Sequence, residues 1–183
     1  MPEPTFEEML DAMKAAAGAL QRREIPFVLA GGLAAWARGG PKSEHDVDFI
    51  VKPEDADAAL EAMADAGLRT ERPPEGWLYK AWEDGCYVDL IFETTAGPVT
   101  DELFERSDEL DVYAVRMQVA SLEDVLVTKL LALSEQSLDF RPVLEISRSL
   151  REQIDWDRVR RRTADSPYAG AFFTLVERLG IAP

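Results

Sequence analysis

The chain has 183 residues, 46% of them hydrophobic and 9% aromatic, which excludes a collagen, a disordered tail and a disulfide-stabilised miniprotein. Cys86 and His45 are its single cysteine and histidine, so neither an internal disulfide nor a His-rich zinc site is expected. The net charge of −15 argues against a protein that grips nucleic acid over its whole surface.

The sequence shows no apolar run near the roughly 20 residues that span a bilayer, so we expect a cytoplasmic protein with no membrane partner. The basic residues are concentrated towards the end of the chain. Residues 141–183 carry 8 basic and 6 acidic side chains, whereas the rest of the chain is strongly acidic. Any polyanionic partner is therefore expected near that end.

The first half of the chain predicts helices alternating with strands. Thr5 and Glu8 fit a capping box, and helical periodicity continues to about Arg22. An apolar run that stops at Gly31-Gly32 predicts a buried strand. The elements expected up to residue 93 are a helix at 5–22, a strand at 27–30, a helix at 33–38, a strand at 46–51, a helix at 54–66, an edge strand at 68–71 and a hairpin with arms at 77–83 and 86–93 around Asp84-Gly85.

Beyond residue 93 the pattern becomes mostly helical. We expect one more strand at 112–119, followed by helices near 121–135, 141–152, 155–164 and 167–179. The chain therefore predicts an α+β domain over residues 1–120 and a helical subdomain over residues 121–183 packed on it.

Three aspartates carry the strongest chemical signal. Asp46 and Asp48 lie two residues apart in a predicted strand, so the pleat directs both carboxylates to one face. Asp89 interrupts an apolar strand, where an unpaired carboxylate is costly to bury. If the two strands are neighbours, the carboxylates converge, and a cation such as Mg²⁺ would compensate their charge.

The diglycine Gly31-Gly32 ends a strand and opens a helix, which is typical of an anion-binding turn. Thirteen residues separate it from Asp46, enough for a short helix and a return. Lys129 is a second candidate, because it falls on the buried stripe of the helix that Ser121 caps. A lysine there points inward and needs an anion, either Asp89 or a triphosphate.

Gly31-Gly32, the thirteen-residue spacing, Asp46-Val47-Asp48 and the later Asp89 together resemble the DNA-polymerase-β-like nucleotidyltransferase superfamily. The diglycine and the helical C-terminal part look most like bacterial toxins of the AbiEii and MenT type. The resemblance implies a mixed central sheet of about five strands flanked by helices. It also implies transfer of a nucleoside monophosphate from an NTP, such as ATP or CTP, to a hydroxyl.

The resemblance further implies roles for single residues. Two Mg²⁺ ions would be held by Asp46 and Asp48, and Asp89 would hold one of them and help to deprotonate the attacking hydroxyl. The positions that match nucleotide-binding residues of the superfamily are Gly31, Gly32, Lys42, Ser43, Lys129 and Asp139. Many relatives carry an arginine and a hydroxyl residue before the first aspartate, where this chain reads Lys42-Ser43-Glu44-His45. Lys42 meets a phosphate only as a point charge, and a phosphate group on Ser43 would oppose NTP entry.

The toxin-like members imply tRNA as acceptor, modified at its 3′ end so that aminoacylation is blocked, and an antitoxin as partner. Arg158, Arg161 and Arg162 share one helical face and are the candidate tRNA contact, the alternative being a solvated face paired with nearby aspartates. Trp77, after a Pro-Pro-Glu-Gly turn, is a candidate stacking residue. Two other functions stay open: a non-catalytic nucleotide- or partner-binding module of this fold, and a nucleotidyltransferase of small molecules such as aminoglycosides.

Overall fold

The computed structural model describes residues 4–43, 46–83 and 85–183. Its centre is a mixed sheet of seven strands, where the sequence predicts about five. In sheet order the strands are β3 (Arg69–Glu71), β4 (Leu78–Glu83), β5 (Cys86–Ile91), β2 (Val47–Val51), β1 (Phe27–Leu29), β9 (Val115–Val119) and β8 (Asp108–Val112). The two-stranded ribbon of β6 (Glu93–Thr94) and β7 (Gly97–Pro98) lies outside this sheet.

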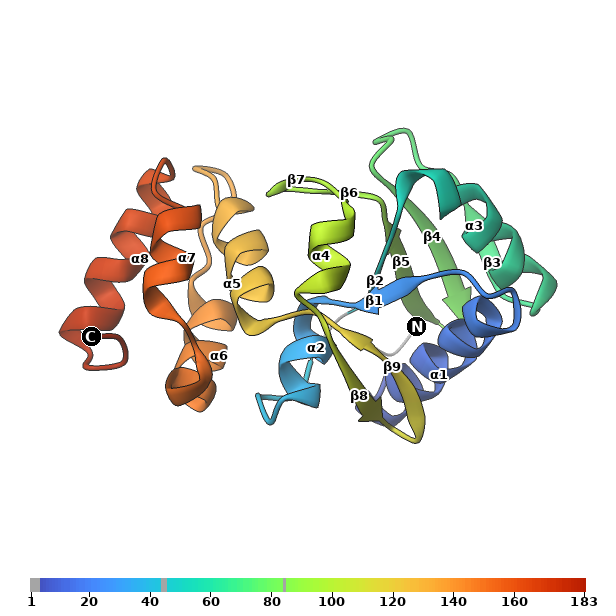
Figure 1. The fold of residues 1–183 in the computed structure, drawn as a ribbon, viewed down its shortest axis with the longest axis horizontal. Coiled ribbons are helices and arrows are strands. Elements are labelled where there is room, and N and C mark those ends of the chain that lie inside the picture. Colours follow the sequence, from blue (N-terminus) through green and yellow to red (C-terminus); the bar gives the residue numbers. More distant parts are fainter. Residues whose placement is uncertain (1–3, 44–45, 84) are drawn as a thin grey trace.

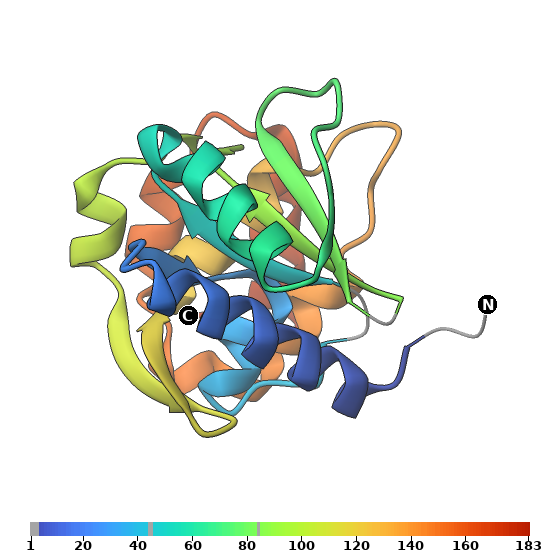
Figure 2. The ribbon, with the colours of Figure 1, turned by 90° about the vertical axis from the view of Figure 1, so that its right-hand side faces the viewer.

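The helices fall into two groups on either side of the sheet (Figures 1 and 2). On one side, α1 (Phe6–Arg22) and α3 (Ala56–Asp65) pack against each other and against β5. On the other side, α2 (Gly31–Ala37) contacts β2 and α5 (Leu122–Leu131). The remaining helices are α4 (Asp101–Glu105), α6 (Arg141–Leu150), α7 (Trp156–Arg162) and α8 (Pro167–Arg178), of which the last three pack on α5, and two 3₁₀ turns lie at Pro53–Asp55 and Arg151–Gln153.

The start of α1 shows how local sequence signals fix an element. Thr5 accepts a hydrogen bond from the backbone N–H of Glu8, and the Glu8 carboxylate accepts one from the backbone N–H of Thr5, which confirms the predicted capping box. The apolar face of α1, including Met13 and Leu20, is fully buried against the sheet. None of the helices in the described part of the chain is long and apolar enough to cross a membrane.

The predicted single strand at 112–119 is in fact a hairpin of β8 and β9, with Val112 paired to Val115. The turn residues Tyr113 and Ala114 have positive φ angles of 47° and 63°. Sequence patterns that mark such turns depend on glycine or asparagine, so a Tyr-Ala turn gives no signal. The hairpin of β4 and β5 is confirmed, although Asp84 of its expected loop lies outside the described residues.

A buried ionic cluster joins the sheet region to the C-terminal helices. Asp124, on α5, is only 4% exposed and accepts two hydrogen bonds of 3.0 Å from Arg106 and one of 2.6 Å from Arg162. Ser121 donates a fourth, of 2.7 Å. Burial acts to raise the pKa of Asp124, but these hydrogen bonds outweigh burial and lower the pKa below its usual value. The cluster therefore stabilises the ionised carboxylate.

We expect Asp124→Asn to lower the free energy of unfolding by about 3 kcal/mol at pH 7, because it buries an amide in place of the anion that pairs with two partly buried arginines. The folded-state pKa of Asp124 is lowered, so its stabilising contribution is complete above the unfolded-state value of about 4 and is lost as the pH falls through the folded-state pKa. Urea unfolding at several pH values measures this. The gap between wild type and variant should shrink below about pH 4.

The matched control is Asp111→Asn, which removes an exposed carboxylate 3.5 Å from Arg116. It should change the stability by less than about 0.5 kcal/mol. A variant at Asp124 as stable as this control at pH 7 would contradict the role of the cluster.

Candidate active site

The site is built on the two parallel strands at the centre of the sheet. In the register of β2 and β5, Asp48 lies directly beside Asp89, as the sequence predicts from neighbouring strands. Their neighbours Val47, Phe49, Val88 and Leu90 are fully buried and belong to the hydrophobic core. The alternation of the pleat therefore directs both carboxylates to the face of the sheet opposite these core residues.

Burial makes both carboxylates costly to ionise, and nearby carboxylates add to that cost. Burial raises the pKa of Asp48 to about 7, and the charges of Asp89 and Asp46 add to this rise, while Lys129 opposes it. Burial also raises the pKa of Asp89, against the opposing effect of Lys80. The site therefore holds more negative charge than its lysines compensate.

Lys80, on β4, is a residue that sequence reasoning missed. Its Nζ lies 3.2 Å from Oδ1 of Asp89, so Lys80, and not Lys129, is the lysine that pairs with Asp89. The signal was present in the sequence. A hairpin that closes around residues 84 and 85 places residue 80 opposite residue 89, which is the register observed.

The diglycine is required by close approach to two side chains of the site. Gly31 has φ of +59°, and a Cβ added to it would lie 2.8 Å from Cγ of Asp48 and overlap Oδ2. A Cβ on Gly32 would lie 3.0 Å from Cβ of Ser43 and overlap Oγ. Any larger residue at either position would displace a side chain of the site.

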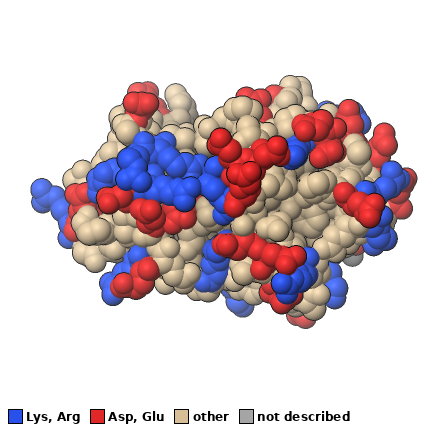
Figure 3. All heavy atoms as spheres, in the orientation of Figure 1, with Lys and Arg blue, Asp and Glu red and all other residues tan. Residues whose placement is uncertain are grey.

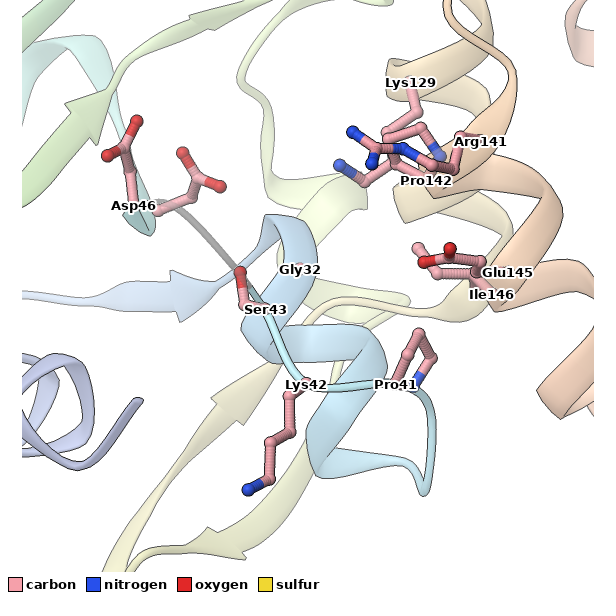
Figure 4. Close-up of a pocket in the computed structure, with 11 residues that line it drawn as sticks. Gly32, Pro41, Lys42, Ser43, Asp46, Lys129, Arg141, Pro142, Glu145 and Ile146 are labelled. Carbon is pink, nitrogen blue, oxygen red and sulfur yellow. The ribbon is translucent and has the colours of Figure 1, made fainter. Parts of the chain in front are cut away.

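A cavity of about 240 Å³ lies between α2, the segment before β2, α5 and α6. We call it the Ser43 cavity (Figure 4). Lys129 and Arg141 lie together on one side of it, Asp46 lies across from them, and Glu145 and Ile146 form a third side. Its lining residues are Gly32, Pro41, Lys42, Ser43, Asp46, Asp48, Lys129, Arg141, Pro142, Glu145 and Ile146.

A larger cavity of about 560 Å³, which we call the Trp77 cavity, lies next to the Ser43 cavity and is also lined by Asp48. Trp77 is 42% exposed there, and Glu75 and Glu93 bring two further carboxylates. Other lining residues are Ala30, Gly31, Ile50, Ile91, Thr94, Thr95, Thr128 and Ala132. Asp48 and Lys129 line both cavities, so they stand at the junction between the two.

Several predicted site residues lie elsewhere or make other contacts. The ammonium of Lys42 lies 5.2 Å from the centre of the Phe6 ring and points away from Asp46. Asp139 does not line either cavity; its carboxylate accepts a hydrogen bond of 2.9 Å from the backbone N–H of Arg141. Glu44 and His45 lie outside the described residues.

The three arginines predicted to share one face of α7 are not all exposed. Arg162 forms an ion pair with Asp124, so it does not share an exposed face with Arg158 and Arg161. The reason is that this side of α7 packs on α5, where a buried carboxylate needs a cation. Figure 3 shows basic side chains gathered over α7 and α8, beside acidic side chains over α4.

No sequence pattern singles out Arg141 and Glu145, which also line the cavity. They come from α6, far along the chain from Asp46 and Asp48. Only the packing of α6 against α5 places them beside Asp46. Arg141 supplies the guanidinium that the sequence lacks before the first aspartate.

The chemistry of the carboxylates fits Mg²⁺. The donors are oxygen atoms alone, and burial beside two other carboxylates makes ionisation of Asp48 costly, a cost that a hard divalent cation would relieve. Among the residues that the structure describes, however, no three Asp, Glu, His or Cys side chains are arranged to hold one ion. The ion-pair partner of Asp89 is Lys80. Mg²⁺ is commonly bound by one or two carboxylates together with substrate phosphates, so a site with fewer than three protein ligands still suits this ion.

The architecture is that of the nucleotidyltransferase fold. The antibiotic-resistance enzyme ANT(2″)-Ia, solved with adenylyl-2″-tobramycin, superposes with a TM-score of 0.64 at 13% identity, covering 89% of this chain and 98% of that chain. The lincosamide antibiotic adenylyltransferase LnuA, solved with lincomycin, superposes with a TM-score of 0.53 at 14% identity, covering 79% of this chain and 96% of that chain. JHP933 from Helicobacter pylori superposes with a TM-score of 0.59 at 16% identity, covering 94% of this chain and 77% of that chain.

A family model described as "Uncharacterised nucleotidyltransferase" matches residues 7–176. The chain therefore belongs to this family and is a nucleotidyltransferase, as the three aspartates and the diglycine indicate. No curated protein sequence matches the chain.

We expect Gly31→Ala to be far more damaging than an ordinary glycine substitution, because the new Cβ would overlap Asp48. Gly180→Ala is the matched control: Gly180 has φ of +66°, and a Cβ there meets nothing within 4 Å. The control should lose about 1 kcal/mol from the left-handed backbone alone. Urea unfolding should show a larger loss for Gly31→Ala, together with loss of nucleotide binding. Equal losses in stability would contradict the steric account.

Proposed function

We propose that the protein transfers a nucleoside monophosphate from an NTP in the Ser43 cavity to a hydroxyl of an acceptor in the Trp77 cavity. The observation that carries this proposal is that the two cavities meet at Asp48 and Lys129. The Ser43 cavity suits a triphosphate, because Lys129 and Arg141 provide cations next to the close turn at Gly32. We further propose residues 1–120 as the catalytic domain and residues 121–183 as a helical subdomain that completes the NTP site.

The reaction forms one bond and breaks one. The acceptor oxygen attacks the α-phosphorus, and the bond from that phosphorus to the oxygen bridging to the β-phosphate breaks, so that pyrophosphate leaves. In our proposal Asp89 accepts the proton of the acceptor hydroxyl, and Lys80 holds the Asp89 carboxylate in position. Lys129, at the junction of the cavities, balances negative charge on the phosphates.

Asp46, Asp48 and Asp89 would hold Mg²⁺ together with the phosphates of the NTP. When bound, Mg²⁺ supplies charge neutralisation for the triphosphate and lowers the pKa of a coordinated hydroxyl. The burial of Asp48 beside the charges of Asp89 and Asp46 supports this assignment.

Asp46→Asn and Asp48→Asn test the proposed reaction. Each should lower transfer of α-³²P-labelled NMP, or release of pyrophosphate, by about a hundredfold or more, because a carboxylate that would hold Mg²⁺ on the triphosphate is lost. The control is Asp57→Asn, which removes an exposed carboxylate on α3 that pairs with Arg72. This change should leave the rate unchanged. Nucleotide binding by the wild type without any transfer would instead support a non-catalytic binding module.

The lining of the Trp77 cavity indicates what the acceptor is like. Among the described residues that line it, Glu75, Glu93 and Asp48 are accompanied by a single cationic side chain, Lys129. Carboxylates attract amino groups and repel phosphates, so a small, amino-bearing molecule with a hydroxyl fits better than a polyanion. The ring of Trp77 offers an apolar face for such a molecule. ANT(2″)-Ia and LnuA, which share the fold, are solved with antibiotic ligands.

The 3′ end of tRNA is the second candidate acceptor. The observation in its favour is the group of basic side chains over α7, where Arg161 is exposed and Arg158 half-buried. In this case the protein would act as the toxin of a toxin–antitoxin pair, close to the AbiEii and MenT type, with a cognate antitoxin as partner. The carboxylates of the Trp77 cavity weigh against it.

Competition between acceptors separates the two candidates. With Mg²⁺ and labelled NTPs, we expect label in an aminoglycoside and not in total tRNA. Trp77→Ala and Glu75→Gln should raise the acceptor KM by about tenfold and leave the KM for NTP unchanged, because both residues line only the acceptor side. Glu61→Gln, an exposed change on α3, is the control.

Label in tRNA that falls when Arg158 and Arg161 are replaced by Gln would instead establish the tRNA candidate. Transfer to both acceptors with no effect of Trp77→Ala would contradict the assignment of the Trp77 cavity.

A further inference from the structure

Glu145 is an acidic side chain in a cavity that is otherwise suited to an anion. It lies one helical turn after Arg141 on α6, at a spacing where the two side chains commonly form an ion pair. Instead, Arg141 lies 3.8 Å from Asp139, and the Glu145 carboxylate has no hydrogen bond or ion pair within the described residues. Its carboxylate is therefore free to bind a ligand in the Ser43 cavity.

The charges of the cavity fix which part of a nucleotide can lie there. A polyphosphate beside Glu145 would be repelled, whereas Lys129 and Arg141 attract it to the adjoining side of the cavity, which faces Asp46. An uncharged part of the nucleotide must then face Glu145. Pro41, Pro142 and Ile146 line the cavity around it and provide the apolar walls that a planar base requires.

We propose that Glu145 is a specificity-determining residue that reads the base of the NTP and selects guanine. This inference rests on the proposed nucleotidyl transfer and deepens it. An ionised carboxylate only accepts hydrogen bonds, with two oxygens side by side. Guanine alone among the four bases presents two adjacent donors, N1–H and the N2 amino group, and so makes two parallel hydrogen bonds to a carboxylate.

The other bases match a carboxylate less well. Adenine and cytosine place an acceptor nitrogen next to their amino group, and uracil has one N–H between two carbonyl oxygens. In each case an acceptor faces an oxygen of Glu145, so these bases make one hydrogen bond fewer than guanine and bring two acceptors into an unfavourable contact. GTP is therefore favoured over ATP and CTP.

Binding without an acceptor tests the selection directly. We would titrate the full chain, with MgCl₂, with the α,β-methylene analogues of GTP, ATP, CTP and UTP by isothermal calorimetry. The GTP analogue should bind the wild type about tenfold more tightly than the others. Glu145→Gln should lose most of this preference, because the amide presents one donor and one acceptor. Glu152→Gln, an exposed change paired only with Arg151, is the matched control and should keep the preference.

The outcomes separate this inference from the proposed function. Binding of all four analogues with equal affinity in the wild type overturns the role of Glu145 and leaves nucleotidyl transfer standing. If the Glu145→Gln variant keeps the preference for the GTP analogue, the role of Glu145 is likewise overturned and nucleotidyl transfer is left standing. If the variant instead abolishes discrimination between GTP and its 2′- or 3′-deoxy analogues while base preference persists, Glu145 reads the ribose and the proposal is wrong. Absence of binding by any analogue removes both proposals.

Discussion

The placement of two carboxylates side by side at the centre of the sheet constrains the structure around them. Asp48 and Asp89 are paired in register on parallel strands, and their charges add to each other in a partly buried setting. Lys80 and Lys129 approach from different elements and compensate only part of this charge. Gly31 passes so close to Asp48 that a side chain has no room. A sheet optimised for stability alone would carry apolar residues at these positions, so the carboxylates are kept at an energetic cost.

Helix α5 connects this charged centre to the C-terminal helices. Its first turn carries Asp124, which binds arginines from both sides, and Lys129 follows at the cavities. The same helix supports α6, from which Arg141 and Glu145 reach the Ser43 cavity. The geometry of the Ser43 cavity therefore depends on an ionic cluster whose residues do not line that cavity. Rigid anchoring of this kind is what holds side chains from distant elements within reach of one ligand.

The sequence predicted the parts of the fold that local patterns determine. The capping box at Thr5, the apolar run ended by the diglycine and the alternation around Asp48 each carry their own signal, and the fold class follows from them. The β8–β9 hairpin was missed because its Tyr113-Ala114 turn contains neither glycine nor asparagine. Arg141, Glu145 and the commitment of Arg162 to Asp124 depend on how helices pack, which periodicity does not reveal. The pairing of Lys80 with Asp89 is intermediate between local patterns and helix packing, since the register of the predicted hairpin is enough to place the two residues opposite each other.

Lys129 belongs to both cavities, and this sharing couples them. In our proposal a triphosphate pairs with Lys129, the one cationic side chain among the described residues that line the Trp77 cavity, and so leaves Glu75 and Glu93 there without an opposing side-chain cation. An amino-bearing second ligand consequently finds a more attractive pocket once the first has arrived. By thermodynamic linkage the second ligand would strengthen binding of the first by the same factor, so the two proposed substrates would bind synergistically without any movement of the backbone.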